Sequence, residues 1–297
     1  MTTRTHALRN TLFSSVGIYT EYVLGMLASI MIARHLGPGH YGVYGLFMWF
    51  VSVGIVITNA GITTGVIKFV AELRGSGRGE LVVPLVAHLR RAQRQHLLVA
   101  LGIGVVLFIA LGDRSVMHLD YVEFVLMLLA IGMRAPYMFN IAIAKGFEAF
   151  DATAKVAMVA APLNLMMVLV AMLLHGPMLW FLIVYVVSSL LFLLVSRAQA
   201  MRLLAPFPCR GALPHELIQR MRRHVRLVSV TVIVGFLIAS DVEILFLSLF
   251  DSRTAAGYFK VAYQLSTGII LLVPGVFGAL LLPKRTRRSR LSLWQWI

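Results

Sequence analysis

The sequence predicts an all-α integral membrane protein with about eight transmembrane helices. Only 13% of its 297 residues are charged and 59% are hydrophobic, whereas an average soluble domain is about 25% charged. The apolar residues form long runs, and the basic residues between the runs fall mainly in alternate connections. These observations exclude an ordinary water-soluble domain, because a chain with so little charge is stable only when lipid covers most of its surface.

Each predicted helix is an apolar run long enough to cross a bilayer. A hydrocarbon core of about 30 Å needs roughly 20 apolar residues in a helix. Eight stretches come near that length: residues 12–34, 43–67, 95–112, 122–144, 156–175, 177–196, 228–250 and 259–282. The first run is too long for the apolar region of a signal peptide and no small-residue cleavage site follows it, so we expect it to remain as a helix.

The distribution of Lys and Arg predicts the orientation of these runs. If the N-terminus is cytoplasmic, 22 of the 27 basic residues lie on the inner side, Arg134 lies within the fourth run, and four lie outside: Arg34, Arg114, Arg253 and Lys260. Cytoplasmic connections carry such an excess of basic residues. We therefore expect a multi-pass protein of the bacterial inner (cell) membrane with both termini in the cytoplasm. The formal charge of +15 then faces anionic lipid headgroups, which disfavours nucleic acid as a partner.

The connections hold no pattern typical of an enzyme. Those predicted outside are short, and those predicted inside, 68–94 and 197–227, are longer and amphipathic; we expect residues 214–227 to form a helix that lies in the membrane interface. Ser-His-Asp, P-loop, Rossmann and zinc-ligand patterns are absent, and the single cysteine, Cys209, excludes an intrachain disulfide or a cysteine metal cluster. The sequence predicts no enzymatic activity, no cofactor and no metal site.

Ionisable residues at mid-depth indicate a polar space inside the bundle. Such a residue facing lipid costs about 2.5 to 3.5 kcal/mol. Four occur near the same depth: Glu21, Arg134, Asp241 and Glu243. We therefore expect the first, fourth and seventh helices to surround a common cavity, with Asn59 and Asn164 as further lining residues.

Two interpretations of Arg134 remain open. In the first, Arg134 pairs with a carboxylate only to lower the cost of inserting the helices into the membrane. In the second, Arg134 attracts an anionic substrate group, while a carboxylate of the seventh helix takes up a proton or cation that drives transport. Asp241 and Glu243 lie about 200° apart around a helix, so they cannot face the same point.

Two hairpins resemble a known family. The first reads MIARHLGPGHYGVYGLFMWFVSVGIVITNAGITTG from Met31 to Gly65, and the second reads SDVEILFLSLFDSRTAAGYFKVAYQL over residues 240–265. They resemble the opening and the seventh helix of the polysaccharide transporters, which belong to the multidrug, oligosaccharidyl-lipid and polysaccharide flippase superfamily. Gly42 and Gly257 occupy corresponding positions 215 residues apart, as expected of two parallel repeats.

The resemblance implies a MATE-like fold and the flipping of an undecaprenyl-diphosphate-linked oligosaccharide by alternating access, for export of polysaccharide or O-antigen (lipopolysaccharide). Arg134, Glu21, Asn59 and Asn164 are the substrate-binding candidates, and Asp241 and Glu243 the coupling candidates. Only Asp241 is supported by a family motif. Glu21 and Arg134 rest on depth and cost alone.

The resemblance also implies a missing part, because family members have about twelve to fourteen helices. We expect a six-helix N-terminal lobe over residues 1–227, the first helix pair of an incomplete second lobe over 228–282, and a basic tail over 283–297 that is either out of frame or binds anionic lipid. The C-terminus is thus expected to be truncated, and a second copy of the chain could supply the missing wall.

Three functional alternatives remain: a cation-coupled multidrug exporter of the same superfamily, an inactive truncated remnant, and a membrane scaffold. The implied partners are the lipid-linked oligosaccharide, membrane lipids, the polysaccharide polymerase and ligase machinery, and a second copy as a homodimer.

Overall fold

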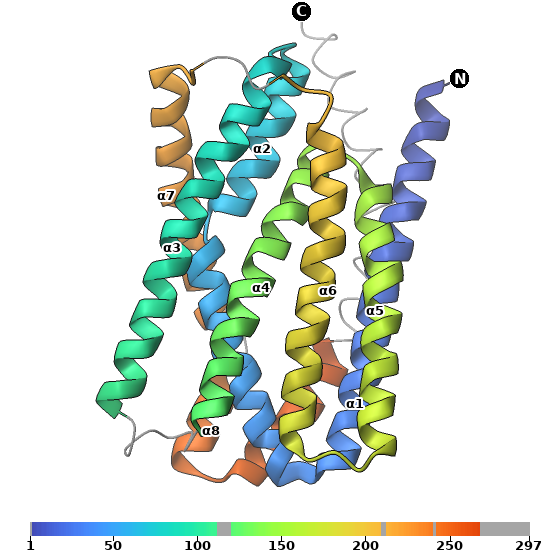
Figure 1. The fold of residues 1–297 in the computed structure, drawn as a ribbon, viewed down its shortest axis with the longest axis vertical. Coiled ribbons are helices and arrows are strands. Elements are labelled where there is room, and N and C mark those ends of the chain that lie inside the picture. The colour runs from blue at the N-terminus through green and yellow to red at the C-terminus, as the bar shows by residue number, and fades with distance from the viewer. Residues whose placement is uncertain (1, 112–119, 209–211, 240–241, 268–297) are drawn as a thin grey trace, which may run out of the picture.

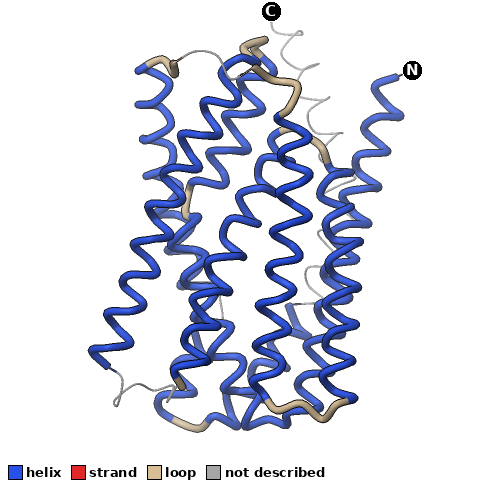
Figure 2. Tube along the Cα trace, viewed as in Figure 1, coloured by secondary structure: helices blue, strands red, loops and turns tan. Residues whose placement is uncertain are grey.

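The structure, a computed structural model, is a bundle of helices (Figure 1). It describes residues 2–111, 120–208, 212–239 and 242–267, with side chains from residue 19 onward, and within these ranges it contains helices and turns but no strand (Figure 2). The elements are α1 Thr2–Asn59, α2 Ile62–Gly75, the 3-10 turn η1 Gly79–Leu81, α3 Val82–Leu111, α4 Tyr121–Gly146, α5 Phe150–Leu173, α6 Met178–Leu204, α7 His215–Ala239 and α8 Val242–Phe250. A further helix covers residues 253–267.

Helix α1 is two helices joined at a break. Gly37 has φ 71° and ψ 169°, outside the helical region, and Pro38 follows it. Glycine adopts a positive φ without steric cost, and proline has no N–H to continue the hydrogen-bond ladder. The chain reverses direction there, so α1 runs along the bundle and back (Figure 1). The break therefore separates the first two predicted runs.

The helices account for the predicted membrane spans. Five are long and apolar enough to cross a membrane, at Tyr19–Asn59, Gly79–Ala110, Tyr121–Gly146, Phe150–Leu173 and Met178–Leu204. The first of them covers most of the first two predicted runs, 12–34 and 43–67. Helices α7 and α8 form a pair bent by 46° that corresponds to the seventh run. The helix over 253–267 begins the eighth run, whose remainder lies outside the described residues. The protein is thus a multi-pass membrane protein.

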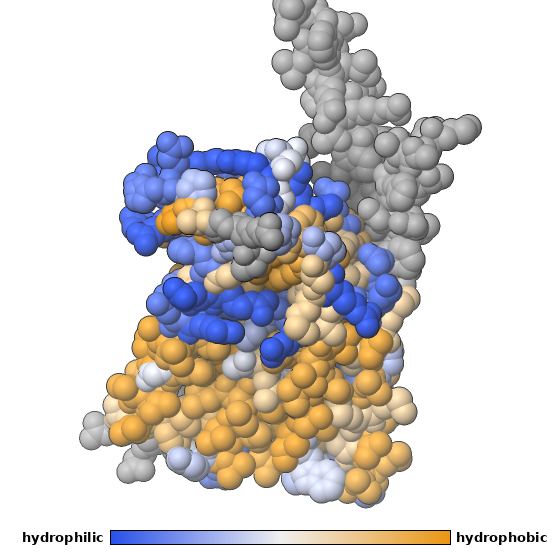
Figure 3. All heavy atoms as spheres, turned by 45° about the horizontal axis from the view of Figure 1, so that its top comes forward, coloured by the Kyte–Doolittle hydropathy of each residue, from blue (hydrophilic) through white to orange (hydrophobic). Residues whose placement is uncertain are grey.

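The connections alternate between two ends of the bundle, as the count of crossings requires. Those after α2, α4 and α6 lie at one end, which we call the basic end, and the turns at Gly37, His175 and Asp251 lie at the opposite end (Figure 1). Hydrophilic residues gather over the basic end, and a hydrophobic surface covers the bundle below it (Figure 3). Within the described residues, the connections predicted on the inner side therefore share one end of the molecule.

The sequence predicts that residues 214–227 form a helix in the membrane interface, and the structure differs from this prediction. The segment forms the first part of α7, which runs without a break from His215 to Ala239. No proline or glycine interrupts this stretch before Gly235, so nothing ends the helix at the membrane surface. Arg220 of α7 donates to both carboxylate oxygens of Glu72 on α2, at 2.9 and 3.1 Å, and so ties α7 to the bundle.

Small residues allow the helices to pack closely, as is common in membrane bundles. A Cβ on Gly54 of α1 would lie 2.5 Å from the Cδ1 atom of Ile131 on α4, and one on Gly146 would lie 2.9 Å from the Cβ of Val70. Helix α5 buries a series of alanines: Ala152, Ala154, Ala157, Ala160, Ala161 and Ala171. The lipid-facing surface carries large apolar side chains instead, among them Leu98 and Ile109 of α3, 69% and 77% exposed.

The two repeat hairpins meet at the opposite end in a reciprocal contact. A Cβ on Gly42 would overlap the carbonyl oxygen of Arg253, and a Cβ on Gly257 would overlap the carbonyl oxygen of Pro38. Pro38 and Gly42 correspond to Arg253 and Gly257 at the 215-residue offset of the sequence repeat. The two backbones therefore touch at equivalent positions, and only glycine fits at either one.

Candidate functional site

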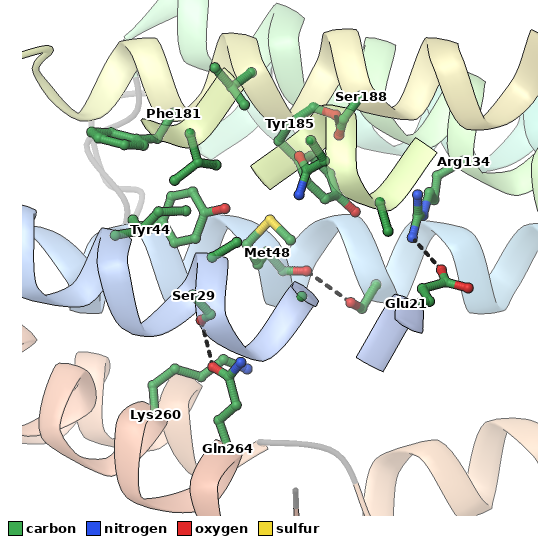
Figure 4. A pocket seen from close by; sticks show the side chains of 18 of the residues that line it. Glu21, Ser29, Tyr44, Met48, Arg134, Phe181, Tyr185, Ser188, Lys260 and Gln264 are labelled. Atoms are coloured by element: carbon green, nitrogen blue, oxygen red, sulfur yellow. Dashed lines mark hydrogen bonds and ion pairs between the residues drawn. The ribbon is translucent and has the colours of Figure 1, made fainter. Parts of the chain in front are cut away.

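A cavity of about 340 Å³ lies inside the bundle between the reversing helices of α1, α4, α5, α6, α7 and the helix over 253–267. Figure 4 shows side chains from these elements converging on it. Its wall includes three of the predicted residues, Glu21, Arg134 and Asn164. The structure thus brings Glu21 and Arg134 together in the wall of one cavity.

Arg134 is held by a carboxylate and two aromatic rings. Its Nη2 lies 3.4 Å from Glu21 Oε1, and its guanidinium carbon lies 4.7 Å from the ring centroid of Tyr137 and 4.4 Å from that of Phe192. Cation–π contacts of this kind attract a guanidinium to the faces of aromatic rings. The side chain remains 19% exposed. The guanidinium is therefore fixed in orientation and still faces the cavity.

Glu21 is the more open partner of the pair. Its side chain is 38% exposed, and it also accepts a hydrogen bond from the hydroxyl of Tyr137 at 3.2 Å. The distance of 3.4 Å to Arg134 is longer than the 2.7 to 2.9 Å of a tight charge-assisted hydrogen bond. The pair thus offsets the cost of insertion and leaves both groups within reach of a ligand.

A second polar group of the wall includes Lys260, which the sequence placed among the outside basic residues. Lys260 and Gln264 project from the helix over 253–267 (Figure 4). Gln264 Oε1 accepts hydrogen bonds from Ser29 Oγ at 2.6 Å and from the Tyr41 hydroxyl at 3.2 Å. Lys260 is the second residue of the eighth apolar run, so the depth signal that singled out Arg134 did not select it.

Aromatic side chains form much of the remaining wall: Tyr41, Tyr44, Trp49, Phe181, Tyr185, Phe192 and Phe236. Tyrosine and tryptophan combine a broad apolar face with one hydrogen-bonding group. The cavity is therefore amphipathic, with cationic groups set among aromatic surfaces.

Asn59 does not line the cavity. It is 6% exposed, its Nδ2 donates to the Ala135 carbonyl at 3.1 Å, and its Oδ1 accepts from Gln93 Nε2 at 2.7 Å. Gln93 also donates to the Ala135 carbonyl, at 2.9 Å. Depth alone suggested a cavity residue, but the rotation of the helix directs this amide into a contact between α1, α3 and α4.

The two coupling candidates do not contribute to the described wall. Glu243 stands in the first turn of α8, where it is exposed to the surroundings of the bundle, and it is not among the cavity residues. Asp241 lies outside the described residues. Within the described part of the chain, Glu21 is therefore the carboxylate that faces the cavity.

The family of the chain follows from its match to known proteins. The profile of the family described as "Polysaccharide biosynthesis protein" matches residues 7–284. The chain belongs to this family. The match agrees with the resemblance seen in the two hairpins, and it supports a membrane protein of the polysaccharide transporter and flippase type.

The fold of this polysaccharide biosynthesis protein is that of a MATE-like transporter. It is similar to a solved structure titled "Outward-facing conformation of a multidrug resistance MATE family transporter of the MOP superfamily", with a TM-score of 0.60 and 15% sequence identity. The match covers 92% of this chain and 61% of that one. The chain thus spans about three fifths of the transporter that it matches. No curated protein matches the sequence.

Proposed function

We propose that this family member flips an undecaprenyl-diphosphate-linked oligosaccharide across the bacterial inner membrane by alternating access. The observation that carries the proposal is the charge of the cavity: the described wall contains two cationic side chains, Arg134 and Lys260, and one carboxylate, Glu21. A wall with more cationic than anionic side chains favours an anionic ligand. A lipid-linked diphosphate has that chemistry.

The geometry of Arg134 suits a phosphate. A guanidinium presents N–H donors in a planar fork that binds two oxygens at once, and the rings of Tyr137 and Phe192 hold that plane in place. Tyr44, Trp49 and Tyr185 offer apolar faces together with hydrogen-bonding groups to the sugars. In this proposal the diphosphate binds between Arg134 and Lys260, while the lipid tail stays in the bilayer.

Alternating access is supported by the contact between the hairpins. The turn after Gly37 and the start of the helix over 253–267 touch through Gly42 and Gly257 at the end opposite the basic residues. With the basic end in the cytoplasm, as the positive-inside rule favours, this contact closes the outer side of the cavity. Both chain termini are then cytoplasmic, and transport requires the contact to separate.

A cation-coupled multidrug exporter is the second candidate, and the 38% exposure of the Glu21 side chain favours it. A carboxylate open to the cavity could bind an organic cation or a proton. Arg134 and Lys260 oppose a cationic substrate in the same space, so this function ranks below the flippase. Overexpression that leaves sensitivity to cationic drugs unchanged would remove it.

The experiment that tests the proposal measures lipid-linked oligosaccharide at the outer leaflet of cells that lack their own flippase. The chain should restore it, and the variant Arg134→Gln should lower it tenfold or more, since one charge-assisted hydrogen bond contributes about 1.5 to 3 kcal/mol. Lys260→Gln should reduce it as well. Arg91→Gln removes a basic residue outside the cavity and serves as the matched control.

Equal restoration by Arg134→Gln, Lys260→Gln and the unchanged chain would contradict the proposed substrate site. If the unchanged chain restores nothing, binding of the lipid-linked oligosaccharide to the purified protein decides the question. Binding that depends on Arg134 would retain the substrate and leave the chain without transport activity of its own, whereas no binding would refute the substrate.

A further inference from the structure

A second cluster of basic residues lies outside the cavity. Arg90 and Arg94 occupy positions one helical turn apart on α3, and Arg197 lies on α6. Figure 1 shows α4 passing between these two helices. Arg94 and Arg197 lie within electrostatic range of Arg90, and Arg197 follows Ser196, which the hydrogen bonds of Arg90 and Asn140 reach.

A chain of hydrogen bonds across α4 fixes the position of Arg90. Its Nη2 donates to Asn140 Oδ1 at 2.9 Å, and Asn140 Nδ2 donates to Ser196 Oγ at 3.2 Å. The guanidinium carbon also lies 5.1 Å from the ring centroid of Phe139. Asn140 and Ser196 are buried, with 3% and 1% exposure. Buried amides and hydroxyls therefore orient this arginine, whereas Arg94 and Arg197 are exposed.

The cluster has no counter-charge in the part of the chain that the structure describes. The ion pairs found there join Arg134 to Glu21, Lys155 to Asp151 and Arg220 to Glu72, and none of them includes Arg90, Arg94 or Arg197. Like charges held together without a carboxylate repel one another. An anion bound among them would remove this cost.

The depth of the cluster corresponds to the edge of the hydrocarbon core. At 1.5 Å per residue, α4 rises roughly 29 Å from Tyr121 to Asn140, close to the bilayer core of about 30 Å. Beyond Arg94, α3 presents apolar side chains to the surroundings, with Leu98 69% and Val106 65% exposed. Leu194, which lies one helical turn before Arg197 towards the opposite end, is 54% exposed. The guanidinium groups thus stand directly above surfaces that acyl chains cover.

We propose that Arg90, Arg94 and Arg197 bind the phosphate of an anionic phospholipid headgroup in the leaflet at the basic end. Guanidinium groups bind phosphate oxygens bidentately, and basic pockets between transmembrane helices at this depth suit anionic headgroups. The lipid bridges α3 and α6 over Asn140, while its acyl chains lie along the exposed faces of both helices. This site is separate from the cavity and does not depend on the proposed function.

The test measures binding of phosphatidylglycerol to the full chain purified in detergent, by native mass spectrometry, with phosphatidylcholine and inorganic phosphate as separate arms. Phosphatidylglycerol should be retained at least fivefold better than phosphatidylcholine. The double variant Arg94→Gln/Arg197→Gln should weaken its binding about tenfold or more, since each basic residue near an anionic headgroup contributes roughly fivefold. Arg91→Gln/Arg223→Gln is the matched control, because it removes the same charge from exposed positions at the basic end outside the cluster.

The double variant leaves the buried bonds of Arg90 in place, so the fold is expected to persist. Arg90→Gln then tests the arginine that Asn140 holds in place. Added to the double variant, it should lower phosphatidylglycerol binding further. Equal loss in the control variant would show diffuse attraction and overturn the site. Equal retention of phosphatidylglycerol and phosphatidylcholine would also overturn the site. Inorganic phosphate that displaces the lipid at equal concentration would show a small-anion site and overturn the lipid assignment.

Discussion

At the scale of single residues, the cost of burying polar groups explains most of what the side chains do. Arg134 and Glu21 could not face lipid individually without a cost of about 2.5 to 3.5 kcal/mol each, and the structure brings them together in one cavity. Asn59 and Gln93 meet the same demand differently, by bonding to each other and to the Ala135 carbonyl. Equal depth therefore does not imply an equal role.

The buried amide pair leads to a stability prediction. Asn59→Leu and Gln93→Leu should each lower the free energy of unfolding by about 1 to 3 kcal/mol, because each strands the partner of a buried hydrogen bond. The double variant should cost much less than the sum of the two. Unfolding in mixed detergent micelles measures these values. Asn164→Leu is the control, since Asn164 has no hydrogen bond within the described residues, and a cost as large as that of Asn59→Leu would contradict the explanation.

At the scale of the elements, the two hairpins behave as copies that meet face to face. Gly42 approaches the Arg253 carbonyl while Gly257 approaches the Pro38 carbonyl, and Ser29 bonds to Gln264 across the same boundary. A side chain at either glycine would force the backbones apart. The contact is a natural place for the cavity to open and close.

A reversible cross-link tests that movement. A Cβ on Gly39 would lie 3.8 Å from the hydroxyl oxygen of Thr254, which brings cysteine side chains at these two positions within reach of each other. In a Cys209→Ser background, Gly39→Cys/Thr254→Cys should cross-link under oxidation, reduce flipping to the level of uninduced cells, and recover on reduction. Each single cysteine variant is the control. Full flipping by the oxidised double variant would show that the contact does not need to separate.

At the scale of the whole molecule, the exterior divides into a basic end and a lipid-facing band (Figure 3). Connections alternate between the ends (Figure 1), so the position of one exposed turn relative to the membrane determines that of all the others. The charge bias favours the cytoplasm for the basic end.

Labelling of single cysteines tests this orientation. In a Cys209→Ser background, a membrane-impermeant maleimide added to intact cells should label Asp251→Cys, in the turn after α8, and leave Ser76→Cys, in the turn after α2, unlabelled. Both positions are exposed. After the cells are broken open, both should react equally. Labelling of Ser76→Cys alone in intact cells would show that the orientation is the opposite, with the basic end outside the cell.

The helices, their alternation and the pairing of mid-depth charges could be predicted from the sequence. The length of an apolar run and the cost of a charge in lipid are properties of the residues themselves, so Glu21 and Arg134 are predictable as cavity residues before any contact is known. The family also follows from the sequence, because residues 7–284 match its profile.

Only the tertiary structure decided which polar residues face the cavity and which bind a neighbouring helix. Depth specifies a position along the helix axis, whereas the direction of a side chain depends on the rotation of the helix, and packing against other helices sets that rotation. For this reason Asn59 points into a helix contact, Lys260 joins the wall of the cavity, and Arg90 bonds to Asn140.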